Sequence, residues 1–203
     1  MNFIKYLLFT FLFLVSTHLL ARDTKTVTFK AFGFSIEKPK SWHDSSSEDF
    51  TENLNRVKSS DEEFDALLKK YTQVPFFSIL KYKNPYDDIN PSLKINVAPK
   101  AVVDPEKPEL YLESIAKTMK SNFANFKLLS KPVLTKLDGH KSAFIKYSYK
   151  LSVEGSTSYD ITSAIWIVTH KRQSFIIGAG FRSDEANGGF AELEKIVVSI
   201  KFL

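Results

Sequence analysis

The stretch "LDGHKSAFIKYSYKL", residues 137–151, decides the fold class. From Ala143 to Leu151, apolar side chains alternate with lysines and serines, and this period of two is typical of a strand with one wet face. The Asp138-Gly139 pair just before it is a strong signal of a hairpin turn. We therefore expect residues 126–137 to pair with residues 141–151.

The pattern continues toward the C-terminus. "YDITSAIWIVTH" (159–170) and "SFIIGAGF" (174–181) read as two more strands separated by a short turn, which predicts a four-stranded antiparallel meander over about residues 126–181. A helix beginning near Gly189 would place four apolar side chains on one face: Phe190, Leu193, Val197 and Ile200. The chain is expected to finish on that helix or just past it.

Helices and strands also alternate in the first half. Ser60 and Glu63 form a capping box at the start of a helix ending before Pro75, and residues 109–123 form a second amphipathic helix. The segment "PFFSILKY" (75–82) is apolar on both faces, which predicts a central strand. The fold class is therefore α+β, with an antiparallel sheet flanked by helices in an α/β/α sandwich.

The N-terminal residues have the order of a secretory signal peptide. Lys5 precedes an apolar run, and cleavage is expected after Ala21, which would leave residues 22–203 as a single domain with no stable membrane span. The alternative is an uncleaved anchor. The signal peptide predicts a periplasmic or secreted protein. Because the 203-residue chain contains no cysteine, such a protein cannot use disulfides and must be stabilised by core packing.

The net charge limits the classes of partner. The chain carries a formal charge of +5, and no run of five like charges marks a nucleic-acid-binding arm, so a nucleic-acid partner is not expected. The basic segment "THKRQS" (169–174) has two interpretations: an ordinary charged turn, or a turn that makes weak contact with anionic surfaces.

Four segments together resemble one known superfamily. They are "FGFSIEKPKSW" (32–42), "LDGHKSAFIKYSY" (137–149), "AIWIVTHKRQSFIIGAGF" (164–181) and "FAELEKIVVSIKF" (190–202). Their order resembles that of the PsbP-like α/β/α sandwich proteins, which include a photosystem II extrinsic subunit, a nuclear Ran-binding relative and DcrB-like bacterial envelope proteins. The resemblance implies an accessory or binding role, because that superfamily is mainly non-enzymatic. It supplies no catalytic motif for positions of this chain.

Two short segments hold the candidate partner-binding residues. Trp42 and His43 follow the first strand, with Trp42 expected to cover one end of the core. Tyr86, Asp87 and Asp88 lie in the loop "NPYDDINPS" (84–92), where an aromatic side chain can anchor a partner. The same loop has oxygen ligands for calcium, but turn-forming hydrogen bonds use these residue types too. The expected partner is an envelope protein or a small ligand, bound through a sheet edge, through this loop or through a cleft beside residues 109–123.

An enzymatic alternative assembles a site from scattered residues. A hydrolase or metal-dependent enzyme would need His43, Asp44, His140 and His170 to meet in space. His140 and His170 are instead expected as solvent-facing turn residues, and the sequence has no dense zinc-ligand pattern and no Gly-x-Ser-x-Gly elbow. No catalytic residue, metal or cofactor is therefore expected.

Gly178 and Gly180 precede the last helix and raise the question of a phosphate-binding loop. They lie inside a strand pattern and lack the third glycine of a dinucleotide fingerprint. We expect them to mark close packing of the backbone under a helix, with Ser183 or Asp184 capping the helix that follows.

Overall fold

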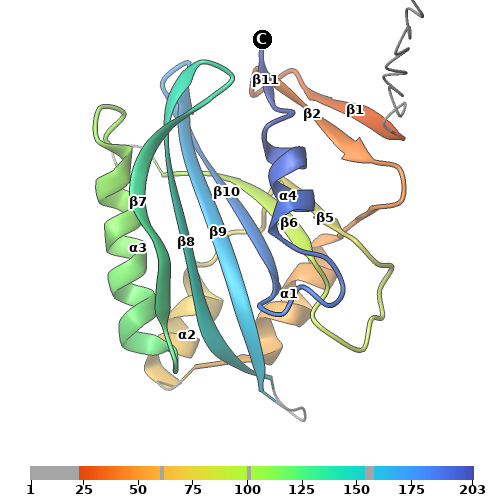
Figure 1. The fold of residues 1–203 in the computed structure, drawn as a ribbon, viewed down its shortest axis with the longest axis vertical. Coiled ribbons are helices and arrows are strands. Elements are labelled where there is room, and N and C mark those ends of the chain that lie inside the picture. Colours follow the sequence, from red (N-terminus) through yellow and green to blue (C-terminus); the bar gives the residue numbers. More distant parts are fainter. Residues whose placement is uncertain (1–22, 60–61, 100–101, 154–157) are drawn as a thin grey trace, which may run out of the picture.

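The computed structural model describes residues 23–59, 62–99, 102–153 and 158–203. Within these ranges the chain forms two antiparallel sheets and four α-helices (Figure 1). The expected signal peptide and Ser60 of the expected capping box lie outside the described residues.

The large sheet contains the predicted meander. Its four long strands are β7 (Lys127–Leu137), β8 (His140–Val153), β9 (Tyr159–His170) and β10 (Gln173–Arg182). Leu137 pairs with His140 across the Asp138-Gly139 turn, in which both residues have positive φ, as the sequence predicted. The sheet continues from β10 through β6 (Ser92–Val97) and β5 (Phe77–Leu80) to β3 (His43–Asp44).

β5 is not the central strand that its apolar sequence predicted. Its neighbours are β6 and the two-residue β3, so it lies near one edge of the large sheet. All four residues of β5 are nevertheless buried. Both faces of β5 are covered by other parts of the chain. On one face, the ring of Phe77 lies 5.2 Å from the ring of Phe29.

The small sheet was not predicted as a separate layer. β1 (Thr24–Phe29) and β2 (Phe34–Pro39) form a hairpin whose turn includes Gly33 at φ +69°. After the last helix, α4 (Phe190–Val197), the chain adds β11 (Lys201–Phe202) to β2. The first two strands and the last strand of the described chain therefore lie in one sheet, with β2 in the middle.

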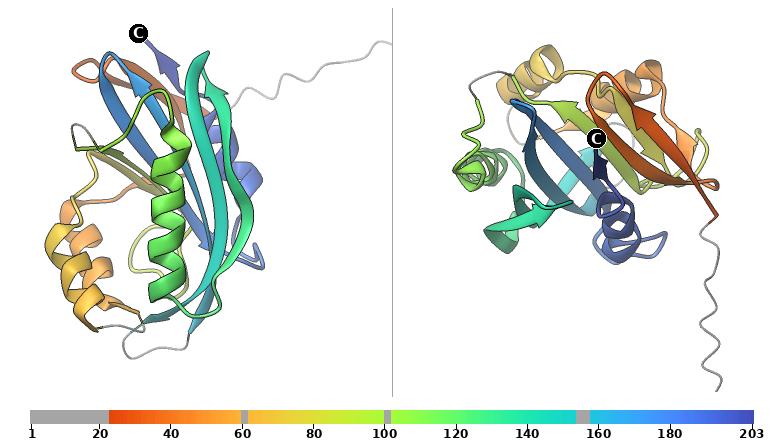
Figure 2. Two further views of the ribbon diagram at one scale, coloured as in Figure 1. Left: turned by 90° about the vertical axis from the view of Figure 1, so that its left-hand side faces the viewer. Right: turned by 90° about the horizontal axis from the view of Figure 1, so that it is seen from above.

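The two faces of the large sheet pack against different layers (Figure 2). One face packs on α4 and the small sheet, around apolar side chains such as Phe34, Phe175 and Leu193. The opposite face packs on α3 (Pro108–Asn122), whose Leu112 is fully buried. We call this second side the helical face.

Two further helices flank α3. α1 (Ser47–Arg56) contacts the helical face through Phe50, and α2 (Glu62–Tyr71) contacts the end of α3 through a Phe64–Phe123 ring pair. The short β4 (Val57–Lys58) joins them and pairs with the end of β8. None of the helices in the described ranges combines the length and the apolar content needed to cross a membrane.

Candidate functional site

Trp42 and His43 have opposite environments. The Trp42 side chain is 2% exposed and belongs to the core, as expected, and its indole Nε1–H donates to Glu192 Oε1 at 3.2 Å. His43 is exposed on β3. The structure therefore assigns Trp42 a packing role and leaves His43 as a surface residue at the end of the large sheet.

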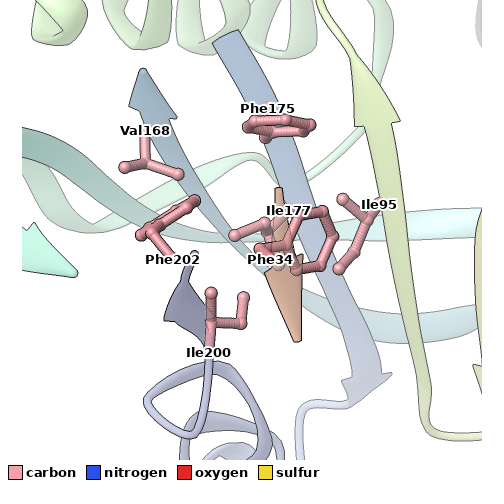
Figure 3. A pocket seen from close by; sticks show the side chains of 7 residues that line it. All are labelled: Phe34, Ile95, Val168, Phe175, Ile177, Ile200 and Phe202. Atoms are coloured by element: carbon pink, nitrogen blue, oxygen red, sulfur yellow. The ribbon is translucent and has the colours of Figure 1, made fainter. Parts of the chain in front are cut away.

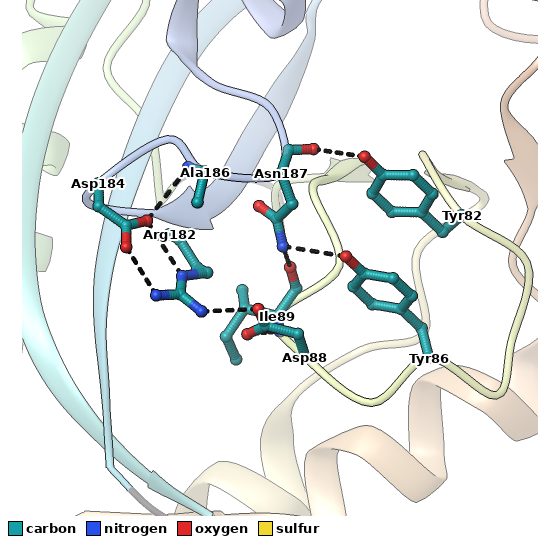
Figure 4. Close-up of polar contacts among 8 residues, drawn as sticks. All are labelled: Tyr82, Tyr86, Asp88, Ile89, Arg182, Asp184, Ala186 and Asn187. Atoms are coloured by element: carbon teal, nitrogen blue, oxygen red, sulfur yellow. Dashed lines mark hydrogen bonds and ion pairs between the residues drawn. The ribbon is translucent and has the colours of Figure 1, made fainter.

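The loop that contains Tyr86, Asp87 and Asp88 is held by a network of internal bonds (Figure 4). The Tyr82 and Tyr86 rings stack at 4.6 Å, and Asn187 Nδ2 donates to the Ile89 carbonyl at 2.6 Å. The Tyr82 hydroxyl in turn donates to the Asn187 carbonyl at 2.9 Å. The 82–90 loop is therefore bound to the segment before α4.

An arginine joins the same two segments through ion pairs. Arg182 Nη1 lies 2.6 Å from Asp88 Oδ2, and Nη2 lies 2.6 Å from Asp184 Oδ2. Hydrogen bonds to Asp184 first and Asp88 second raise the pKa of Arg182, and the bond from Arg182 lowers the pKa of Asp184. Asp88 thus has a structural partner, whereas Asp87 stays exposed.

The loop uses its other oxygen ligands in turns. Asn90 Oδ1 accepts the Tyr82 backbone N–H at 3.0 Å, and Asn84 Nδ2 donates to Asp49 Oδ1 at 3.0 Å. Among the described residues, no group of three histidine, aspartate or glutamate side chains is placed to hold a metal ion. Asn84 and Asn90 therefore use their side chains in hydrogen bonds within this part of the structure.

His140 and His170 are not the solvent-facing turn residues that the sequence predicted. Their rings lie 4.9 Å apart, and Phe202 of β11 contacts both rings, at 4.6 and 4.8 Å. The hairpin ends that carry them are covered by β11, which the sequence did not reveal as a strand. His170 is 9% exposed, and burial is the main cause of its lowered pKa, with His140 second.

The apolar centre between the two sheets is closed. Seven side chains from β2, β6, β9, β10 and the C-terminal segment surround it: Phe34, Ile95, Val168, Phe175, Ile177, Ile200 and Phe202 (Figure 3). The space between them is too small for a water molecule. These residues therefore form packed core and line no ligand cavity.

The helix caps and the two glycines differ from expectation. Neither Ser183 nor Asp184 caps α4: Asp184 is bound to Arg182 and Ser183 Oγ lies 2.9 Å from Thr162 Oγ1, while the Phe190 N–H that begins the helix donates to Glu185 Oε1 at 3.3 Å. A Cβ placed on Gly178 would meet no atom within 4 Å, so this glycine is not packed under a helix. Gly178 instead leaves open space on the helical face, whereas a Cβ on Gly180 would lie 3.6 Å from Ser92 Oγ.

β7 forms an edge of the large sheet and carries four exposed apolar side chains. Leu128, Leu129, Val133 and Leu134 are 42%, 51%, 46% and 54% exposed. Nine large apolar side chains are this exposed in the described part of the chain, so nearly half of them lie on one strand. We call these four residues the β7 patch. Sequence reasoning located the strand but missed the patch, because the two register shifts near Ser130 break the alternation.

Comparison with known proteins shows the fold. Neither protein-family models nor curated proteins give a match to the sequence. Among solved structures, PsbP from the cyanobacterium Synechocystis sp. PCC 6803 matches with a TM-score of 0.51 and 10% identity, covering 89% of this chain and 92% of that chain. LpqN of Mycobacterium tuberculosis, described as involved in cell envelope biogenesis, matches with a TM-score of 0.52 and 12% identity, covering 88% and 90%. The expected PsbP-like α+β fold is thus confirmed.

Proposed function

We propose that this chain is an exported, non-enzymatic accessory protein of the bacterial cell envelope that binds another envelope protein through the β7 patch. The observation that carries the proposal is the exposure of four large apolar side chains along one edge strand. Several large apolar side chains exposed on one edge strand favour a protein–protein contact, since their contact with water is unfavourable.

The backbone of β7 favours side-chain contacts over simple strand addition. Register shifts between Leu128 and Ser130, and between Ser130 and Val133, interrupt its pairing with β8, and Pro132 lacks a backbone N–H. Such features protect an edge strand against pairing with a further strand. The apolar side chains next to them are left for a partner whose surface is complementary in shape.

The 82–90 loop is a second candidate surface. Its bonds to Arg182 and Asn187 hold the exposed Asp87 and the half-buried Tyr86 in fixed positions, which would reduce the entropy lost on binding. It exposes little apolar area, however. For this reason we place the main contact on β7 and treat the loop as the alternative.

Envelope location rests on two further arguments. The order of residues 1–21 is that of an export signal. LpqN, which shares the fold, is described as involved in cell envelope biogenesis, so an accessory role in the envelope is compatible with this architecture. Fractionation of cells that produce the full chain, with sequencing of the mature N-terminus, tests export. A start at Arg22 in the envelope fraction is expected, and an intact chain in the cytosol would contradict it.

The binding surface is tested by capture from solubilised envelopes with matched variants. Leu129→Ser combined with Leu134→Ser should lower the yield of a reproducible partner, because both side chains leave the apolar contact. Asp87→Ser, on the loop, should leave the yield unchanged. If only Asp87→Ser lowers the yield, the loop is the binding surface; if the double variant recovers as much partner as the unaltered protein, the β7 patch is not the contact.

A further inference from the structure

The helical face of the large sheet contains a floor without side chains. Gly178 and Gly180 lie on β10, opposite Lys94 and Ser92 of β6 and opposite Ile165 and Ser163 of β9. Both glycines are partly exposed, and a Cβ on Gly178 would meet no atom within 4 Å. We call these two residues the glycine floor. The open space lies at Gly178, and Ser92 Oγ borders the Gly180 end, 3.6 Å from where a Cβ would stand.

Lys94 lies at one side of the glycine floor with its charge uncompensated. Its Nζ lies 4.8 Å from the centre of the Phe50 ring of α1. In the described ranges no carboxylate lies within ion-pair distance of Lys94, although this side chain is half-buried. Burial lowers the pKa of its ammonium group. An unpaired cation in such surroundings is costly, and an anion beside it would offset that cost.

A second polar group without a partner lies next to Lys94. Ser78 of β5 is the register neighbour of Lys94 and is 7% exposed. Within the described residues, the buried Ser78 hydroxyl has no hydrogen-bond partner. Because Phe77 and Ile79 belong to the core on the other side of the sheet, the Ser78 side chain lies on the helical face with Lys94. One acceptor placed here would satisfy both donors.

The opposite side of the glycine floor is largely apolar. Ile165 and Ile176 are partly buried on the helical face, where they pack in the same cluster as residues of α3. Tyr147 and Tyr149 follow on β8, and Ser163 hydrogen-bonds to their hydroxyls. Burial raises the pKa of both phenols, so they stay neutral at physiological pH. The far side therefore suits an uncharged, apolar body.

We propose that the glycine floor binds an organic monocarboxylate with an apolar body, whose carboxylate accepts from Lys94 Nζ and whose body lies over Gly178 toward Ile165. The Ser78 hydroxyl supplies a second donor to the same carboxylate. The absence of a side chain at Gly178 leaves room for the apolar body of the ligand. This site is independent of the β7 patch.

The test uses dansyl-undecanoate, a fluorescent fatty acid, with the purified mature chain. Its emission should rise on binding, decanoate should displace it, and decanol, which has the same apolar body without the charge, should displace it poorly. Lys94→Met should weaken binding about tenfold or more, since a charge-assisted hydrogen bond is lost. Gly178→Val should also weaken it by filling the floor.

Lys146→Met is the matched control. Lys146 likewise lies over an aromatic ring, with its Nζ 4.4 Å from the centre of Phe190, but on the opposite face of the sheet. Affinity should be unchanged in this variant. No binding by the unaltered protein, equal displacement by decanol and decanoate, or equal weakening by Lys146→Met and Lys94→Met would each overturn the proposal.

A second measurement keeps the test independent of folding defects. Lysine side chains can be labelled by reductive ¹³C-methylation, and the Lys94 signal, assigned by its loss in Lys94→Met, can be titrated with and without decanoate. A bound carboxylate favours the ammonium form, so the Lys94 pKa should rise when decanoate is added. A Lys94 titration that decanoate does not alter would contradict the proposed contact.

Discussion

Trp42 and Glu192 are 150 residues apart in the sequence, and the Trp42 indole N–H donates to the Glu192 carboxylate at 3.2 Å. The other carboxylate oxygen of Glu192 lies 2.6 Å from Lys81 Nζ. One side chain at the start of α4 therefore connects the segment after β2 with the segment after β5. This arrangement holds α4 over one face of the large sheet.

Replacement of Trp42 tests that connection. Trp42→Phe removes the indole donor and some buried volume, so the free energy of unfolding should fall by about 1–3 kcal/mol. Urea denaturation followed by circular dichroism measures it. His43→Gln changes the exposed neighbour and should stay within about 0.5 kcal/mol of the unaltered protein. Equal losses in the two variants would show that Trp42 has no special packing role.

The attachment of α3 depends on a buried leucine. Leu112 is fully buried under α3, whereas Leu110 on the same helix is 50% exposed. Leu112→Ala should therefore lower the free energy of unfolding by about 2–5 kcal/mol. Leu110→Ala, the matched control with the same change of side chain, should alter it by no more than about 0.5 kcal/mol. A small loss in Leu112→Ala would mean that α3 is held elsewhere.

Stability should fall in mild acid because of His170. Its pKa is lowered in the folded protein, so the unfolded chain binds the proton first. The resulting loss of folding stability is absent well above pH ~6.5, the ordinary pKa of histidine, and it grows as the pH drops below that value. Urea denaturation at pH 7.5 and pH 5 should show a smaller decrease for His170→Phe than for the unaltered protein. His43→Phe, at an exposed histidine outside this cluster, should leave the decrease as it was. An unchanged decrease in His170→Phe would exclude this cause.

Arg182 should control the mobility of the 82–90 loop. Arg182→Met removes the ion pairs to Asp88 and Asp184, so backbone amides from Lys83 to Ile89 should exchange with solvent faster, without a change in the rest of the large sheet. Hydrogen exchange with mass spectrometry measures this. Lys150→Met breaks the single 3.6 Å contact with Asp160 and should leave the loop unaffected. If exchange in the loop is unaltered in Arg182→Met, the prediction is wrong, and the stacked rings of Tyr82 and Tyr86 hold the loop instead.

The parts of the fold with a repeating pattern were predictable from sequence. Alternation over residues 141–151 and the Asp138-Gly139 turn predicted the β7–β8 hairpin, and apolar spacing predicted α3 and α4. β11 was missed because a strand of two residues is too short to show an alternation of apolar and polar side chains. Its absence from the prediction also hid the small sheet and the contact between His140 and His170, since Phe202 of β11 contacts both rings.

The candidate surfaces were harder to predict than the strands. The sequence marked Tyr86, Asp87 and Asp88 as a loop of interest. It could not show that Asp88 pairs with Arg182 and that Tyr86 accepts from Asn187, because these partners lie about a hundred residues away. The β7 patch depends on register shifts that alternation cannot show. The open floor at Gly178 depends on where the helices lie, because the same glycine under a helix would be packed.

Site-specific photo-crosslinking in living cells tests the proposed partner contact most directly. A benzoylphenylalanine at position 129, in the β7 patch, should give one discrete crosslinked product that contains a second envelope protein. The same group in place of Glu113, exposed on α3, should give none. No product from position 129, a product containing only a second copy of this chain, or the same product from position 113 would contradict the account.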